Sequence, residues 1–244
     1  MNKNNNYIIL GLIFILILWL SSSLWIDNSL VLPTISEVFH SLKNILSKGL
    51  TYLIILNTFL KLLLIIAISL IIAMLLAILS FVFEKFENFI KPIMVIMKTI
   101  PVIAIIILLL IVFGNSKSPY IMTILVTLPI MYEGILISLK NINPEIIDDV
   151  KTIEGMNFSI VKSIYIPLIF FHVMASITQS FGLGLKVMIM GEFIAQPNNT
   201  IGYILQFERS NLNTSAILAW TIILIIIVLV MELLINKLIK TYKY

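Results

Sequence analysis

The sequence predicts an all-helical integral membrane protein, and three observations indicate this class. Of the 244 residues, 60% are hydrophobic and only 11% are charged, whereas a soluble domain carries roughly 25% charged residues. The mean hydropathy is +1.12, and the apolar residues fall in long runs. A soluble chain of this length has too much surface to bury so many apolar side chains, so lipid must cover them.

Six apolar segments are long enough to cross a bilayer, because a hydrocarbon core of about 30 Å needs about 20 helical residues. Helix is the only conformation that satisfies the backbone hydrogen bonds of such a run within one segment. The predicted spans are residues 7–25, 56–83, 90–113, 120–139, 167–190 and 217–235. No internal repeat or separate soluble region interrupts them, so we predict a single domain over residues 1–244.

The first and third segments differ from the other predicted spans. The first could be read as a signal peptide, but it continues to Trp25 without a small-residue cleavage site, so we expect an uncleaved span. The third contains Pro92 and Pro101, which predicts a kink, because proline breaks the hydrogen bonding of a helix interior.

The basic residues at the ends of these segments predict the orientation. With the N-terminus in the cytoplasm, ten basic residues fall on the cytoplasmic side and five on the outer side. This bias favours cytoplasmic N- and C-termini, which requires an even number of spans. The net charge of +4 thus reflects placement in a membrane, and we expect membrane lipid and no nucleic acid as a partner.

A short amphipathic helix is predicted between the first and second spans. Thr34 and Glu37 have the spacing of a capping box at its start. Its apolar stripe at helical period consists of Val38, Leu42, Ile45 and Leu46. We expect this helix to lie at the outer membrane interface.

The longest cytoplasmic connection, residues 140–166, carries the most structured polar segment. Asn143-Pro144-Glu145 is typical of a helix start, and Gly155 stands where a helix commonly ends. The apolar residues between them share one face, namely Ile146, Val150 and Ile153. So short a helix is marginal alone in water, so its apolar face must pack on the membrane domain itself or in a groove of a cytoplasmic partner.

Polar and ionisable side chains within the spans are the candidates for a translocation path, since such groups are costly in lipid unless they are paired or hydrated. They are Glu133 in the fourth span, and Gln179, Lys186 and Glu192 in or just beyond the fifth. The alternative is that they form pairs between helices or lie at the level of the lipid headgroups. Gly182 and Gly184 are more typical of close helix packing than of a ligand site.

No catalytic, cofactor or metal site is predicted. Cysteine is absent, the two histidines are far apart in the sequence, and no GxxxxGK[ST] phosphate loop occurs. If transport uses ATP, another chain must therefore bind it. A membrane-embedded enzyme would need clustered His, Asp or Glu at one depth, and the spans lack such a cluster.

The cytoplasmic connection resembles the EAA loop of binding-protein-dependent ABC importer permeases. The matching stretch begins with Asp148, Asp149 and Val150 in place of Glu-Ala-Ala. Glu154 stands at the expected glycine, with Gly155 one place later, and Pro167 matches the final proline.

Three further stretches, in the same order along the chain, are similar to the branch that carries nitrate, sulfonates, taurine and bicarbonate. The first is Leu32-Pro33-Thr34, before the predicted interfacial helix. The second runs from Lys98-Thr99-Ile100-Pro101 to Phe113-Gly114. The third covers Gly184 to Glu192 and continues through Ile201-Gly202-Tyr203 to Asn213-Thr214. Together these stretches extend the resemblance over residues 32–235.

The resemblance implies a six-span permease of the type I importer fold in a bacterial inner (plasma) membrane. Its implied partners are a cytoplasmic ATP-binding subunit, an extracytoplasmic substrate-binding protein and a second permease subunit, most simply an identical copy. The resemblance to the EAA loop implies that the residues docking on the ATPase are Glu145, Ile146, Asp148, Asp149, Val150, Ile153, Glu154, Gly155 and Pro167. The implied cargo is a small solute such as a sulfonate, nitrate or a vitamin-precursor pyrimidine. The competing hypothesis is an ATP-independent secondary transporter or channel, which needs no docking helix.

Overall fold

The computed structural model of the chain describes residues 3–143, 145, 164 and 166–241. The helices in these ranges are α1 (Lys3–Ile26), α2 (Ile35–Leu46), α3 (Gly49–Val82), α4 (Glu84–Thr99), α5 (Val102–Lys140), α8 (Ile166–Ala195), α9 (Ile201–Ser210) and α10 (Thr214–Thr241). The described ranges contain no strand, and five of these helices are long and apolar enough to cross a membrane. The predicted all-helical membrane class is confirmed.

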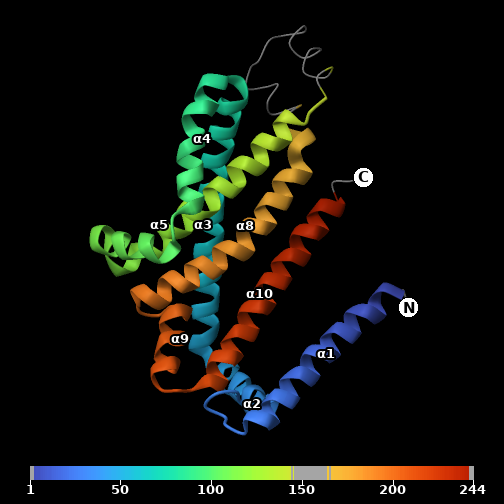
Figure 1. The fold of residues 1–244 in the computed structure, drawn as a ribbon, viewed down its shortest axis with the longest axis vertical. Coiled ribbons are helices and arrows are strands. Elements are labelled where there is room, and N and C mark those ends of the chain that lie inside the picture. The colour runs from blue at the N-terminus through green and yellow to red at the C-terminus, as the bar shows by residue number, and fades with distance from the viewer. Residues whose placement is uncertain (1–2, 144, 146–163, 165, 242–244) are drawn as a thin grey trace.

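The third predicted span, residues 90–113, is divided between two helices. α4 ends at Thr99 and α5 begins at Val102, directly after Pro101. Within α5, Gly114 has φ 72° and ψ 177°, a conformation that glycine tolerates and most residues do not. Figure 1 shows that α5 changes direction along its length, in agreement with this kink. Among the described residues the candidate spans therefore number five rather than the predicted six, because residues 90–113 do not form one helix and the first part of α5 is continuous with the predicted fourth span.

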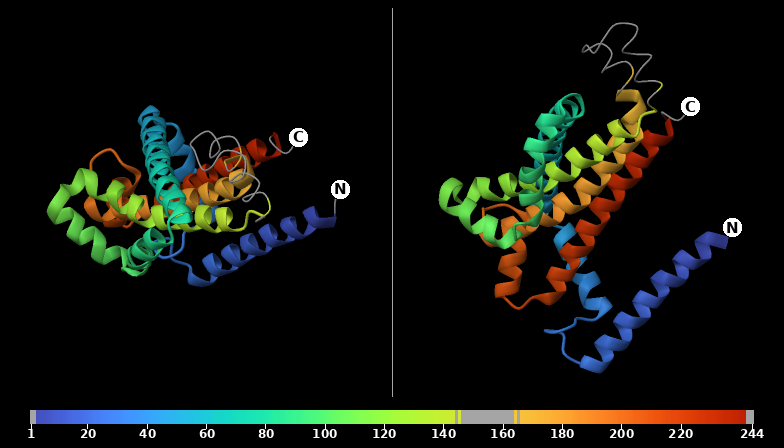
Figure 2. Two further views of the ribbon diagram at one scale, coloured as in Figure 1. Left: turned by 90° about the horizontal axis from the view of Figure 1, so that it is seen from above. Right: turned by 45° about the horizontal axis from the view of Figure 1, so that its top comes forward.

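The ends of the helices gather at two opposite ends of the molecule (Figures 1 and 2). The C-terminal ends of α3, α5 and α10 lie at one end of the molecule, together with the start of α8. The opposite end holds α2, α9 and the beginnings of α3 and α10. The connection predicted to bind an ATPase therefore leaves α5 and rejoins α8 at the same end as the C-terminus of α10.

α1 meets the rest of the chain near its own C-terminal end. There the Trp19 Nε1–H donates to the Pro33 carbonyl at 3.0 Å, and the Ser23 hydroxyl donates to the Leu32 carbonyl at 3.4 Å. The preceding turns of α1 stand apart from the other helices, and their apolar side chains are exposed on every side. Such an all-round apolar helix needs lipid or another chain around it.

The core lies where α5 crosses α3 and α8. Fully buried apolar side chains meet there from all three helices, among them Leu62, Met131, Ile135, Phe181 and Met188. Hydroxyl groups bridge α3 and α5, since Ser69 lies 2.9 Å from Thr127 and Ser80 lies 2.8 Å from the Tyr132 hydroxyl. Polar contacts of this kind hold membrane helices together in place of the hydrophobic effect.

Glycine allows the closest approach in this core, as the sequence predicts for Gly184. A Cβ built on Gly184 would lie 3.1 Å from Thr127 Cγ2 and 3.4 Å from Leu62 Cδ1. Gly134 on α5 likewise faces the Ser176 side chain on α8, without room for a Cβ. Gly182 is different, because only Val228 comes within 4 Å, at 3.9 Å.

The predicted interfacial helix is α2, and its capping box is confirmed. The Glu37 N–H donates to the Thr34 hydroxyl at 3.3 Å, and the Thr34 N–H donates to the Glu37 carboxylate at 2.8 Å. The Thr34 N–H, together with a hydrogen bond from the Ser29 hydroxyl, holds the pKa of the Glu37 carboxyl below its usual range. Val38 and Ile45 are buried, and the Ser41 hydroxyl lies 2.8 Å from that of Ser215 at the start of α10.

Candidate functional site

Glu192 lies near the C-terminal end of α8, and its side chain is 0% exposed. Its Oε2 accepts the Gly202 N–H at 3.2 Å, while Oε1 has no hydrogen-bond partner among the described residues. Gly202 is the second residue of α9, whose Thr200 N-cap accepts from the Tyr203 N–H. A carboxylate at a helix N-terminus is stabilised by the orphan N–H groups and the helix dipole. Glu192 therefore fixes the start of α9 against α8.

Gly202 is required for this contact. A Cβ at this position would lie 2.5 Å from the Phe193 backbone nitrogen and 2.6 Å from the Glu192 carbonyl carbon. Backbone atoms cannot rotate aside as a side chain can, so the two helices meet here only because position 202 has no side chain. The glycine and the carboxylate form one structural unit, which we call the α8–α9 junction (Glu192, Phe193 and Gly202).

Glu133 is paired with a lysine of the preceding helix. It forms an ion pair with Lys98 at the end of α4, and the two side chains are 39% and 36% exposed. A second pair joins the same two helices, because the Lys140 Nζ donates to the Glu87 carboxylate at 2.5 Å. Glu133 thus lies in an inter-helix pair, the alternative that the sequence left open for it.

Lys61 is also paired, and its partner lies far away in the sequence. The Lys61 Nζ on α3 donates to the Tyr120 hydroxyl on α5 at 2.8 Å, and it lies 5.1 Å from the centre of the same ring. Lys61 is one of the five basic residues that the predicted orientation assigns to the outer side. The aromatic partner could not be foreseen, because its position depends on how α5 crosses α3.

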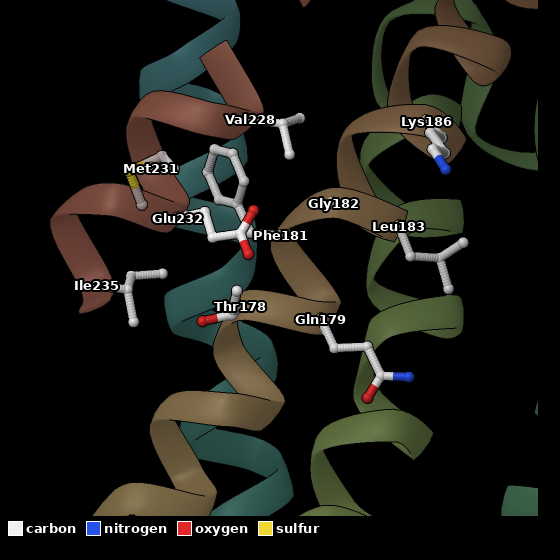
Figure 3. A pocket seen from close by; sticks show the side chains of 10 residues that line it. All are labelled: Thr178, Gln179, Phe181, Gly182, Leu183, Lys186, Val228, Met231, Glu232 and Ile235. Carbon is white, nitrogen blue, oxygen red and sulfur yellow. The ribbon is translucent and has the colours of Figure 1, made fainter. Parts of the chain in front are cut away.

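A cavity of about 350 Å³ opens between α8 and α10. Its polar lining consists of Thr178, Gln179 and Lys186 from α8 and Glu232 from α10 (Figure 3). In Figure 3 the Glu232 carboxylate points from α10 towards α8, whereas Gln179 and Lys186 extend from the side of α8 away from α10. Two of the predicted path residues, Gln179 and Lys186, therefore share one cavity, and Glu133 and Glu192 do not line it.

A second, larger hollow lies along the same two helices. Its volume is about 510 Å³, and its lining is apolar apart from Lys186 and Thr221. Lys186 and Val228 line both hollows, and we call the two hollows together the α8–α10 groove. Phe193 and Leu205 bring its far end to the α8–α9 junction and to α9.

Glu232 was missed as a candidate, although a signal for it exists. It lies within the predicted sixth span, residues 217–235, as a single carboxylate in an otherwise apolar run. The same rule that singled out Glu133 applies to it, since an ionisable group in a span is a functional candidate by default. Within the described ranges, no three His, Asp or Glu side chains gather closely enough to hold a metal ion.

Only the two ends of the predicted ATPase-docking loop are described. The Glu145 N–H donates to the Asn143 side-chain oxygen at 3.1 Å, and Pro167 lies in the first turn of α8, where proline is tolerated. The other predicted docking residues lie outside the described residues, namely Ile146, Asp148, Asp149, Val150, Ile153, Glu154 and Gly155.

Comparison with known families decides the identity of this helical bundle. The family model described as "Binding-protein-dependent transport system inner membrane component" matches residues 69–244. The chain belongs to this family. No curated relative matches the sequence. The matched region of the permease begins within α3 and includes α4, α5, α8, α9 and α10. It therefore contains the α8–α10 groove, the α8–α9 junction and the connection between α5 and α8.

Proposed function

We propose that this permease is the membrane subunit of an ATP-driven importer and that the α8–α10 groove forms part of its solute path. The family assignment supports the importer class. The groove supports the path, because it gathers Thr178, Gln179 and Lys186 on a helix that also contributes buried side chains to the apolar core. A cation and an amide within a membrane span are expected to face water or a ligand rather than lipid.

A separate cytoplasmic chain supplies the ATPase in this proposal. The amphipathic segment 145–155 docks on that chain with its apolar face, and movement of the loop is transmitted to α5 and α8, which it joins. Because these two helices pack extensively on each other, they would move as a unit and open the groove alternately to either side. An external binding protein delivers the solute, and a second, identical copy completes the path.

The proposed orientation places both termini in the cytoplasm of a bacterium. The predicted excess of lysines at that side supports it. It also agrees with the arrangement of the helix ends, since α5, α8 and α10 bring their loop-bearing and C-terminal ends together (Figure 1). The opposite face, with α2 and α9, would then meet the binding protein.

Co-purification of the ATPase tests this proposal. We expect affinity-tagged permease, isolated from its source membrane, to retain an ATP-binding subunit in stoichiometric amount. Changing Ile146 or Val150 to Asp places a charge in the apolar face and should remove most of the bound ATPase. Thr152→Asp adds the same charge to the polar face of the predicted helix and serves as the matched control.

Two outcomes contradict the proposal. One is that no ATP-binding subunit accompanies the permease, and the other is that Ile146→Asp and Thr152→Asp retain the ATPase equally. Solute transport by the chain alone in liposomes without ATP would instead support the secondary-transporter hypothesis.

A further inference from the structure

Glu192 is a buried carboxylate with one oxygen that lacks a partner. Its side chain is 0% exposed, and its Oε2 accepts the Gly202 N–H, whereas Oε1 has no hydrogen-bond partner among the described residues. Neither of the two ion pairs in the described ranges includes this residue. A buried acceptor without a donor is costly, and more so when it is charged, so the vacant oxygen calls for a physical explanation.

Lys61 is the charged side chain that acts electrostatically on the Glu192 carboxylate. It lies in α3, which begins at the end of the molecule that holds α2 and α9 (Figure 1). Side chains of a helix lean towards its N-terminus, so Lys61 reaches towards that end and towards the α8–α9 junction. Its ammonium is nevertheless held by the Tyr120 hydroxyl at 2.8 Å, and it forms neither of the ion pairs of the described ranges.

The two acceptors for this ammonium lie on helices that are closely packed. A Cβ built on Gly191, the residue before Glu192, would lie 3.0 Å from the Cα of Pro119, the residue before Tyr120. Tyr120 on α5 and Glu192 on α8 thus lie beside the same helix contact, whereas Lys61 lies on the third helix, α3. A shift of α3 along α5 and α8 would carry the ammonium from one acceptor towards the other.

We propose that Lys61 is a two-position latch, held by the Tyr120 hydroxyl in this structure and by the vacant Glu192 oxygen when ATP binds to the transporter. This inference rests on the proposed function, because the predicted ATPase-docking connection joins α5 and α8 and not α3. Movement of α5 and α8 together past α3 is a shear between packed helices, and it exchanges one partner of the ammonium for the other. One cation with two acceptors gives the two discrete arrangements that a switching element needs.

Cross-linking with a carbodiimide tests this inference, because the reagent joins an amine to a carboxyl group only where the two are in contact. Dicyclohexylcarbodiimide enters membranes, links Lys61 to Glu192 as an amide and takes up the released water as dicyclohexylurea. Mass spectrometry of peptides measures the yield in the permease–ATPase complex in nanodiscs, without nucleotide and after trapping with ATP and vanadate. We expect the yield to rise on the order of tenfold on trapping.

Tyr120→Phe separates the latch from a fixed contact. This variant keeps the aromatic ring but removes the hydroxyl that holds the Lys61 ammonium. It should therefore raise the yield of the Lys61–Glu192 cross-link without nucleotide. The Lys140–Glu87 pair is the internal reference, since these groups are in contact in this structure and should cross-link without nucleotide in parent and variant alike.

Arg209 supplies the matched control, because it is another basic residue near the α8–α9 junction. Its Cζ lies 5.8 Å from the centre of the Phe193 ring, and it is exposed towards the end of α9. Arg209→Gln should leave the Lys61–Glu192 yield unchanged in both states.

Two results for the parent chain would overturn the inference: equal yields with and without trapping, or no Lys61–Glu192 cross-link in either state while Lys140–Glu87 reacts. A Tyr120→Phe yield no higher than that of the parent without nucleotide also contradicts it. The proposed function is judged separately, by co-purification of the ATPase. If no ATPase accompanies the permease, the Tyr120→Phe comparison still decides whether the ammonium has two positions, because it needs no nucleotide.

Discussion

Gly202→Ala is expected to detach the start of α9 from α8 and to destabilise the end of the permease that holds α2 and α9. The added methyl group would meet the Phe193 nitrogen at 2.5 Å and the Glu192 carbonyl carbon at 2.6 Å, and neither backbone atom can move without displacing α8. Overpacking of this kind costs about 1–3 kcal/mol. Displacement of α9 also breaks the hydrogen bond from Gly202 to Glu192 and leaves a buried carboxylate unpaired. Thermal unfolding in detergent should show a clear drop in Tm.

Gly49→Ala is the matched control for this substitution. Gly49 begins α3, and nothing lies within 4 Å of a Cβ built there. Because alanine favours helix over glycine by up to about 1 kcal/mol, this variant should be as stable as the parent or slightly more so. Equal losses of Tm in the two variants would contradict the account of the α8–α9 junction.

Gly184→Leu is expected to disrupt the central crossing of α3, α5 and α8. A Cβ alone would lie 3.1 Å from Thr127 Cγ2, 3.4 Å from Leu62 Cδ1 and 3.5 Å from Ile66 Cδ1, so the three further carbon atoms of leucine have no space. Thr127 also bonds to Ser69, and its displacement would weaken the bridge between α3 and α5. We expect a loss of about 3 kcal/mol or more, at the upper end of overpacking costs.

Denaturant titration in mixed micelles measures this loss against Gly11→Leu. Gly11 lies on α1, where nothing comes within 4 Å of a built Cβ. The same glycine-to-leucine change should therefore be tolerated at position 11 and cause loss of folded protein at position 184. A Gly184→Leu variant that unfolds at the same denaturant concentration as Gly11→Leu would show that the crossing is not closely packed.

Features set by local sequence were predictable. The long apolar runs correspond to α1, α3, α8 and α10, and the capping box of α2 follows from the side chains of Thr34 and Glu37, which lie three residues apart. Each of these signals depends on residues within a few turns of one another. The importer family was likewise indicated by short motifs in a consistent order.

Features that depend on how distant segments meet were not predictable. The predicted span of residues 90–113 joined the second half of α4 to the first part of α5, although the two helices are separate and meet at Pro101. The pairs Lys98–Glu133 and Lys61–Tyr120 join residues 35 and 59 positions apart, so their formation depends on the crossing of whole helices. Nor does the sequence show that Glu192 faces the start of α9. Glu232 differs from these, since it could have been identified from its place in an apolar run.

Accessibility of residue 179 to water tests the central claim most directly. The chain contains no cysteine, so a single Gln179→Cys substitution introduces a unique thiol. We predict that a membrane-impermeant maleimide labels this thiol in the assembled transporter and that the labelling rate changes when ATP binds. Leu64→Cys, on the exposed apolar surface of α3, should remain unlabelled in lipid. If positions 179 and 64 react equally slowly with and without ATP, the α8–α10 groove is not the solute path.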